Sequence, residues 1–387
     1  MLTPLKIVQA NAVYDPPLRD ANALLESYHT LTEWSAAMAA AGARVSVVQR
    51  FHTAGRVERD GVSYEFVKDS QVPWLSTTAA PAEFVNAIAG YAADVVHVNG
   101  LIFPKLVAAI RQAVGPRTVI VVQHHGGEFP IRGGGLVGWW QRSRWRSGLA
   151  AADAASFTAR EQAEPWRAAG VLAEQRIVEI VEAGTTLRRI DRNRARTAIG
   201  LSGDPLILWV GRLTTNKDPL TVLDGLERAL PALPDARVVM VFGDMTLIDD
   251  VDDRVRGSQI LSERVTLAGR IARDELPNYY AAADVFVSGS HSEGSGYALI
   301  EAMSAGVVPV ITDIPAFRVI AGDCGRRWPP GDASGFAEAL LHACGADLSG
   351  QRACVIDHYN AVLRWEAIVQ RTISEYGALI DAKHGAA

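Results

Sequence analysis

The sequence predicts an α/β protein built from two doubly wound domains, each with a parallel sheet between layers of helices. Three observations predict this class. Short apolar runs rich in valine and isoleucine recur along the chain, helix-like stretches separate them, and a polar, arginine-rich segment divides them into two series. With 387 residues, 49% of them apolar, the chain can bury two cores of ordinary size.

The first series holds four expected strands. Between the first two, residues 31–43 have the alanine-rich pattern of a helix that ends at Gly42, a residue type suited to the position after a helix. The expected strands are 5–10, 43–49, 94–99 and 118–123.

The second series holds five expected strands, and the joint between the series lies within 182–204. We therefore expect one domain over 1–185 and a second over 186–362. A final helix, at about 363–387, has no strand after it and is expected to pack back on the first domain. The five strands are 206–211, 237–243, 264–269, 284–289 and 307–312.

Composition narrows the class of function. A net charge of -5 argues against a dedicated nucleic-acid binder. Cys324, Cys344 and Cys354 have no metal-ligand spacing and form no even disulfide set, which suits a reducing cytoplasm. The N-terminus shows no signal-peptide pattern, and no apolar run approaches the ~18 residues that span a bilayer. We expect a soluble, cytoplasmic protein, attached at most to the inner face of a membrane.

Glycine follows most strands of the second series, at the strand ends where doubly wound folds bind ligands. Arginine follows two of these glycines, in Gly211-Arg212 and Gly269-Arg270, which indicates an anionic ligand. Lys217 lies in the same loop as Arg212, just before an expected helix, so that both cations can reach one anion. Two solvated surface charges are the alternative.

Residues 291–311, HSEGSGYALIEAMSAGVVPVI, place Glu293 before a Gly-Ser-Gly turn and Glu301 inside the helix that the turn begins. A rise of ~1.5 Å per residue sets the two carboxylates on the order of 10 Å apart. That is too far for the ~5 Å carboxylate pair of a retaining glycosidase. It suits an extended ligand, with a sugar at Glu293, a diphosphate at the turn and a ribose at Glu301. A helix start with a favourably placed acid is the alternative.

Three further patterns each leave two interpretations. His124 and His125 lie between a buried strand and two glycines. One of them can orient an acceptor hydroxyl or the reacting sugar, and the alternative is a structural role. A structural role is what we expect for His97, which lies inside its strand.

Residues 249–253, DDVDD, are expected to form an acidic loop or helix start rather than a metal site. Residues 138–149 interleave tryptophans with arginines, which suits an anionic membrane surface or acceptor groove, or a helix whose tryptophans fill the core.

Taken in order, these motifs resemble the retaining GT-B glycosyltransferases of family four, over nearly the whole chain and most strongly from about 205 to 335. The likeness rests on the Gly-Arg…Lys loop at 211–217, the Gly-Asp at 243–244, and two glutamates separated by seven residues, Glu293 and Glu301. The resemblance implies two Rossmann-like domains facing each other across a cleft. The first would take the acceptor and the second a nucleotide-sugar donor.

The resemblance also implies a hexosyltransferase that moves a sugar from a UDP- or GDP-linked donor to a hydroxyl acceptor with retention, without metal or cofactor. The acceptor is a glycan, a glycolipid or a small molecule. The implied catalytic residues are His125, preferred to His124 because it abuts the glycines, and Arg212, Lys217 and Glu293. The implied donor-binding residues are Gly211, Arg270, Ile271, Gly294, Ser295, Gly296, Tyr297 and Glu301.

The chain departs from the family pattern in two places. The loop after the first strand usually carries two glycines, whereas residues 11–27 contain none, and Ser295 stands where an aromatic residue is common. The alternatives are a nucleotide-sugar epimerase of the same fold and a non-catalytic nucleotide-sugar binding protein. Isomerised donor without an acceptor favours the epimerase, whereas lost turnover with unchanged donor binding in a His125 variant favours an enzyme over a binding protein.

Overall fold

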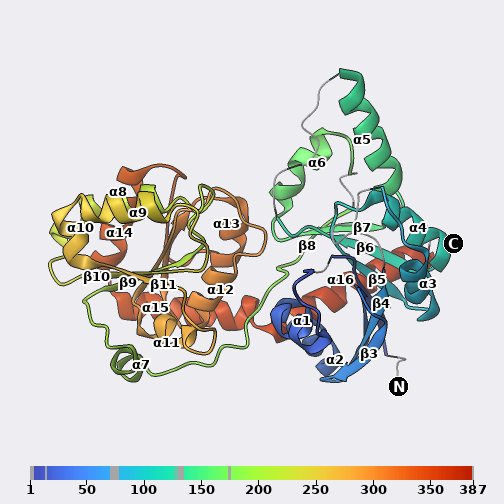
Figure 1. Cartoon of the computed structure of the whole chain (residues 1–387), viewed down its shortest axis with the longest axis horizontal. Coiled ribbons are helices and arrows are strands. Elements are labelled where there is room, and N and C mark those ends of the chain that lie inside the picture. The colour runs from blue at the N-terminus through green and yellow to red at the C-terminus, as the bar shows by residue number, and fades with distance from the viewer. Residues whose placement is uncertain are drawn as a thin grey trace. The chain divides into compact units, whose positions relative to one another are not determined.

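The computed structural model describes residues 4–13, 15–69, 78–126, 129, 135–172 and 176–385. Its contacts divide the chain into two compact units. The first comprises Met1–Ala183 and Trp365–Ala387, and the second comprises Gly184–Arg364. Each unit is an α/β unit with one sheet between helices (Figure 1).

The sheet of the first unit has eight strands in the order β3-β4-β2-β1-β5-β6-β7-β8. Its centre is formed by valine-rich strands that are buried along nearly their whole length, as strands covered by helices on both faces must be. The strands are β1 Lys6–Asn11, β2 Arg44–Phe51, β3 Gly55–Arg59, β4 Val62–Lys68, β5 Val95–Asn99, β6 Val119–Gln123, β7 Ala154–Phe157 and β8 Ile177–Glu179.

One strand pair of this sheet corrects the expectation of a purely parallel arrangement. β3 pairs with β4 in antiparallel register, from Gly55 opposite Phe66 to Arg59 opposite Val62. The turn between them is Asp60-Gly61, and both residues have positive φ, 52° and 76°. An Asp-Gly pair between alternating strands is a strong hairpin signal. The hairpin was therefore predictable from the sequence, but it was missed because the prediction followed the alternation of strands and helices.

Helices cover both faces of the first sheet. α3 and α4 lie over one face, with the C-terminal half of α5 packed against α4, and α2 and α16 lie over the other face (Figure 1). Phe84, Leu106 and Trp145, from three different helices, join the sheet residues in one core cluster. The helices are α1 Ala21–Ser27, α2 His29–Ala40, α3 Ala82–Gly90, α4 Pro104–Val114, α5 Gly135–Leu149, α6 Glu164–Ala168 and α16 Trp365–Gly385, with a 3-10 turn at Arg160–Ala163.

The terminal helix α16 belongs to the first unit. Tyr376 is fully buried on it and lies 2.6 Å, through its hydroxyl, from Nδ1 of His97 on β5. Trp365 donates from its indole nitrogen to Glu33 of α2 at 3.1 Å. These contacts fasten the last segment of the chain to strands and helices formed by its first hundred residues.

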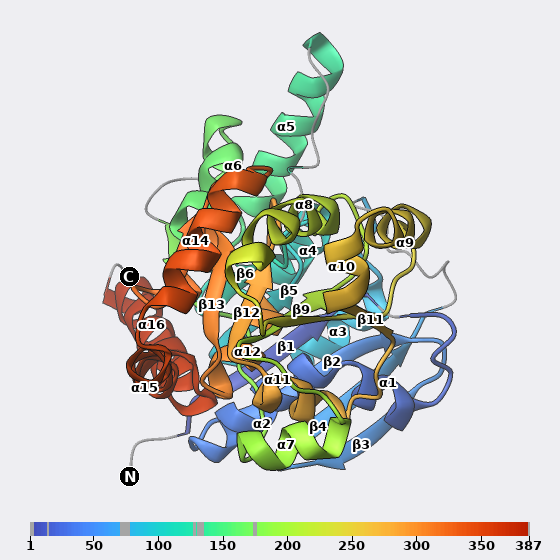
Figure 2. The ribbon, with the colours of Figure 1, turned by 90° about the vertical axis from the view of Figure 1, so that its left-hand side faces the viewer.

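The second unit has a six-stranded sheet, parallel throughout, in the order β11-β10-β9-β12-β13-β14. Figure 2 shows α8, α9 and α14 on one face of this sheet and α11 and α12 on the other. The strands are β9 Leu206–Gly211, β10 Arg237–Phe242, β11 Val265–Gly269, β12 Val285–Ser288, β13 Val308–Thr312 and β14 Arg326–Trp328. The helices are α7 Arg192–Ile199, α8 Pro219–Ala229, α9 Ile248–Arg256, α10 Gln259–Arg264, α11 Leu276–Ala282, α12 Tyr297–Ser304, α13 Pro315–Ala321, α14 Ala333–Gly345 and α15 Leu348–His358, with short turns at Leu230–Ala232 and Tyr359–Leu363.

Strand order locates the expected ligand edge in the second unit. In the second unit the chain runs outward from β9 through β10 to β11, then returns to β12 on the other side of β9. A crevice opens outside the carboxyl ends of strands where the order reverses in this way. The loops after β9 and β12, which hold Arg212, Lys217 and Glu293, therefore lie at the reversal. No helix in the described part of the chain is both long and apolar enough to cross a membrane.

Candidate active site

The loops after β9 and β12 are held together by Asn216. Its backbone oxygen accepts from the amide of His291 at 2.8 Å. Its side chain donates to the Ser292 carbonyl at 3.0 Å and accepts from the Ser292 amide at 3.1 Å and hydroxyl at 3.0 Å. His291 in turn lies 2.9 Å from Asp218. Asn216 was not predicted, although its position beside Lys217 in a strand-end loop is a signal for it.

This link between the loops places Lys217 against Glu293. The Lys217 ammonium forms an ion pair with Oε1 of Glu293, which also accepts from the Ser290 hydroxyl at 2.7 Å. Both charged side chains are largely buried, with 18% and 13% of their surfaces exposed. A partly buried pair fixed by a second hydrogen bond is far more ordered than a surface ion pair. The ammonium group is therefore held in one place at the strand ends.

Two arginines approach the same edge of the sheet from neighbouring strands. Arg212 follows β9 and is exposed. Two hydrogen bonds from Thr246, with the charge of Arg212 adding to them, lower the pKa of Asp244 in the loop after β10. Arg270 follows β11 and donates to the carbonyl of Gly243 at 3.0 Å. Ile271 beside it is half-buried. The edge thus carries Lys217 and two exposed guanidinium groups.

The Gly-Ser-Gly turn begins helix α12, as the sequence predicts. Gly296 is its N-cap with φ of 61°, and a Cβ at this position would lie 2.6 Å from Cδ1 of Ile320. Only glycine combines that conformation with that close approach. Tyr297 is the first helical residue, and Ser295 before it is buried. Gly294 and Gly211, both half-buried, complete the backbone at the two strand ends.

Glu301 is buried inside α12 rather than open to solvent. It is the fifth residue of the helix, and its Oε2 accepts from the hydroxyl of Tyr280 on α11 at 2.8 Å. Burial, followed by the Glu301 charge, raises the pKa of Tyr280 well above its ordinary value, so the phenol remains a donor. Tyr280 was not predicted. Its only signal is a tyrosine pair, 279–280, in an otherwise alanine-rich helix.

In the first unit, the structure distinguishes the two adjacent histidines after β6. His124 is buried and stacks on Phe157 with ring centroids 4.8 Å apart, and it accepts from the Gly126 amide at 3.3 Å. Burial, with a smaller contribution from the charge of His125, lowers the pKa of His124 to about 4. His97 on β5 is also buried, and its pKa falls to about 3 for the same two reasons. Both are neutral packed residues, as expected for His97.

His125 has a different environment. Its Nδ1 lies 2.6 Å from Oε2 of Glu182, and the His125 side chain is 48% exposed whereas that of Glu182 is 6% exposed. Burial opposes protonation of His125, but the charge of Glu182 and the hydrogen bond to it outweigh burial and raise the pKa of His125. This geometry favours His125 over His124 as the reactive histidine. Glu182, in the stretch after β8, was not predicted.

Two remaining groups of predictions concern metal binding and residues that the structure does not describe. DDVDD forms the first turns of helix α9, which confirms the helix-start interpretation. Among the residues that the structure describes, no three His, Cys, Asp or Glu side chains are grouped so that they could hold a metal ion. Gly127 and Glu128, which follow the histidines, and part of the loop at 11–27 lie outside the described residues.

Comparison with known proteins agrees with this arrangement. The family model described as "Glycosyl transferases group 1" matches residues 204–345, and that described as "Glycosyl transferase 4-like domain" matches residues 29–180. The chain is 28% identical to GDP-mannose:cellobiosyl-diphosphopolyprenol alpha-mannosyltransferase of Xanthomonas campestris, over 74% of this chain and 75% of that protein.

Two solved structures share the fold. Sucrose-phosphate synthase from Thermosynechococcus elongatus superposes with a TM-score of 0.68 at 20% identity, covering 98% of this chain and 100% of that one. Anabaena HepE in complex with UDP-glucose superposes with a TM-score of 0.65 at 16% identity, covering 97% and 100%. With a glycosyltransferase family matched in each half and a GT-B fold throughout, the protein belongs to the group 1 glycosyltransferases and is a hexosyltransferase.

Proposed function

We propose that this protein transfers a sugar from a nucleotide-diphosphate donor to a hydroxyl acceptor with retention of configuration, and that it does so without a metal ion. The observation that carries the proposal is the fixed Lys217–Glu293 pair at the reversal of strand order, with Arg212 in the same loop. A pyrophosphate needs fixed positive charge as it leaves, and preorganised cations stabilise that charge without rearranging. Lys217 and Arg212 would supply it.

The remaining donor contacts follow from position. The first amides of α12, opened by Gly296, would face the phosphates, since helix N-termini bind anions. Glu293 would contact the donor sugar while it holds Lys217. Glu301, oriented by Tyr280, would accept from the ribose hydroxyls. Arg270 and Ile271 would border the base.

In front-face attack no carboxylate of the enzyme acts as a nucleophile, and this agrees with the hydrogen bonds that Glu293 makes. Glu293 already accepts from Lys217 and Ser290, so it is poorly placed to act as a nucleophile. In the proposed step the acceptor oxygen bonds to the anomeric carbon on the face that the diphosphate leaves. The acceptor proton passes to a phosphate oxygen, and both electrons of the broken bond leave with the diphosphate. His125, oriented by Glu182, would position the acceptor hydroxyl or the reacting sugar.

The relatives suggest the substrates. The Xanthomonas protein is named for GDP-mannose and a cellobiosyl-diphosphopolyprenol acceptor, and the Anabaena structure holds UDP-glucose. For this chain we favour a GDP- or UDP-linked hexose as donor and a glycolipid as acceptor. Such an acceptor agrees with peripheral membrane contact through residues 138–149.

A thermal-shift panel of UDP- and GDP-sugars tests donor binding. A ligand at 100 times its Kd stabilises the native state by ~2.7 kcal/mol, and Lys217→Ala should remove most of the shift. A control variant, Arg256→Gln, changes an exposed arginine on α9 and should keep it. If no nucleotide sugar raises the melting temperature, the proposal is wrong. Epimerised donor without an acceptor would instead identify an epimerase, and binding without turnover a binding protein.

A further inference from the structure

The N-terminal half of helix α5 carries an exposed apolar surface, formed by Leu136, Val137, Trp139 and Trp140. Leu136 is 81% exposed and Trp140 is 70% exposed. The same helix buries Trp145 and Leu149 in the core of the first unit, so its position is fixed from the other end. Figure 1 shows the N-terminal half extending beyond the sheet of that unit. The sequence left two interpretations for these tryptophans, and the structure assigns Trp145 to the core and the other two to the surface.

The charge of this helix is opposite in sign to that of the whole protein. The chain has a net charge of -5, yet α5 contains three arginines, Arg142, Arg144 and Arg146, and no acidic residue. Arg146 donates to the Gly170 carbonyl at 2.6 Å, which fastens the helix to the loop after α6. An exposed apolar end followed by a basic stretch is the pattern of a segment that lies in the interface of an anionic bilayer.

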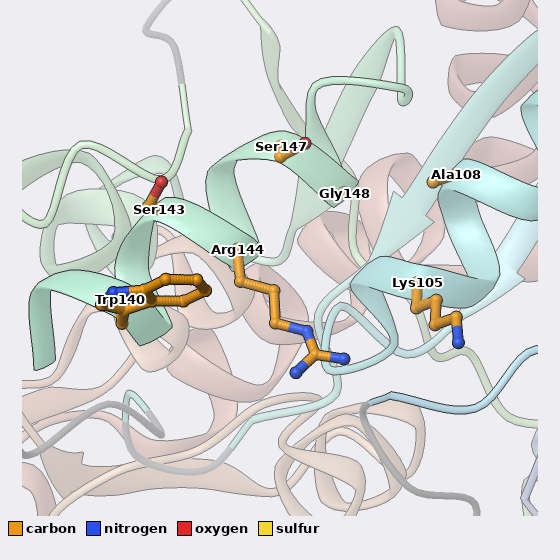
Figure 3. A pocket seen from close by; sticks show the side chains of 7 residues that line it. All are labelled: Lys105, Ala108, Trp140, Ser143, Arg144, Ser147 and Gly148. Carbon is orange, nitrogen blue, oxygen red and sulfur yellow. The ribbon is translucent and has the colours of Figure 1, made fainter. Parts of the chain in front are cut away.

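A cavity of about 390 Å³ lies where α5 meets α4. Its lining includes two cations, Lys105 and Arg144, two hydroxyls, Ser143 and Ser147, and the Trp140 ring (Figure 3). The helices can approach closely here because residue 148 is glycine, where a Cβ would lie 2.5 Å from Pro104. The two cations are suited to a phosphate, and a tryptophan in the same lining suits the depth of lipid headgroups.

We propose that α5 docks this protein on an anionic phospholipid membrane, with Leu136, Val137, Trp139 and Trp140 inserted among the lipids and a lipid phosphate bound by Lys105 and Arg144. Leu136, Trp140 and Arg144 follow each other at intervals of four residues, so they lie on one side of the helix in order of depth. The apolar residues enter first, and the cations meet the headgroups.

The docking surface lies on the edge of the sheet that also holds His125. Helix α4 follows β5 and begins at the carboxyl end of that strand, and the last turn of α5 packs there, with Gly148 against Pro104. The docking surface therefore extends outward from the strand edge where His125 follows β6. A membrane bound there would deliver an acceptor carried by a lipid to that edge. This consequence rests on the proposed function, whereas the docking itself does not.

Sedimentation with vesicles, without donor or acceptor, tests the docking. The full-length protein is mixed with phosphatidylcholine vesicles and with vesicles that also contain phosphatidylglycerol. We expect binding to the anionic vesicles only. Lys105→Gln with Arg144→Gln should weaken it about 25-fold, since each cation at the surface contributes about fivefold. Leu136→Ser with Trp140→Ser should weaken it about tenfold or more.

Matched control variants distinguish binding through this surface from nonspecific electrostatic or hydrophobic binding to vesicles. Arg256→Gln and Met245→Ser change an exposed arginine and an exposed apolar residue of the second unit and should bind like the wild type. Equal binding by all variants, or no preference for anionic vesicles, would overturn the proposal. So would a wild-type dimer that Leu136→Ser with Trp140→Ser makes monomeric, since the surface would then serve a second copy of the chain. A donor thermal shift that persists without vesicle binding would refute docking and leave the proposed function intact.

Discussion

Replacing Glu182 by Gln tests whether this buried carboxylate acts through His125. The change keeps the volume and a possible acceptor oxygen but removes the negative charge 2.6 Å from Nδ1. In the wild type that charge outweighs burial and raises the pKa of His125. In the variant this charge no longer opposes burial, so the pKa of His125 should be lower than in the wild type.

The size of the effect follows from the exposure of the pair. A hydrogen bond to a charged group contributes ~1.5–3 kcal/mol. His125 is 48% exposed, so solvent screens part of this interaction and we expect about 1 kcal/mol. In kcat/KM that is about fivefold. The limb of the pH–rate profile that belongs to His125 should also move to lower pH.

The stability difference between wild type and variant should depend on pH with a defined sign. Because the folded pKa of His125 is raised, its contribution is fully present below the unfolded pKa of about 6.5 and is lost as the pH rises through the folded value. The difference in melting temperature should therefore be larger in acid than in alkali.

A double-mutant cycle with His125→Ala tests whether Glu182 acts through His125. If Glu182 acts through His125, Glu182→Gln should change neither kcat/KM nor the pH profile in the His125→Ala background. A variant that melts earlier but keeps the wild-type pH limb would reduce Glu182 to a structural residue. An equal loss of activity in both backgrounds would show that Glu182 acts by another route.

Two further substitutions test how the donor loops are held. Asn216→Ala removes three side-chain hydrogen bonds to Ser292 and should weaken donor binding about tenfold, measured by calorimetry, because Lys217 is no longer fixed. Unchanged affinity would mean that the link between the loops is unnecessary. Tyr280→Phe removes the phenol that donates to buried Glu301 and should cost ~1–3 kcal/mol of stability, seen as a lower melting temperature. A donor shift that survives while stability falls would separate the structural role of Glu301 from ribose binding.

The sequence predicted the central strands well because buried parallel strands are continuous apolar runs. The expected 206–211 and 307–312 differ from β9 and β13 by one residue or less. Short strands were less visible. β8 has three residues, and β7 is an alanine-rich segment, AASF, that lacks the β-branched pattern. The β3–β4 hairpin was missed because strands were expected to alternate with helices, and the Asp60-Gly61 turn signal was not used.

Candidate site residues that directly follow a strand were predictable from the sequence. The side chains that hydrogen-bond to them were not. Arg212, Lys217 and Glu293 lie within a few residues of β9 or β12, so sequence position alone indicates the edge they share. Their contact depends on β9 and β12 being neighbours, which strand order decides. Glu182 reaches His125 past β7, from a segment that follows β8.

The same logic indicates where function can be altered without touching a motif. Asn216, Tyr280 and Glu182 each fix a charged or polar group that the motif supplies, and each comes from a neighbouring loop or helix. A relative can therefore retain every motif residue and still lose the preorganisation that makes a cation or a histidine effective, because a group misplaced by about 1 Å can cost on the order of 100-fold in rate. Activity in this family should thus be judged from the groups that hold the motif residues as well as from the motif residues themselves.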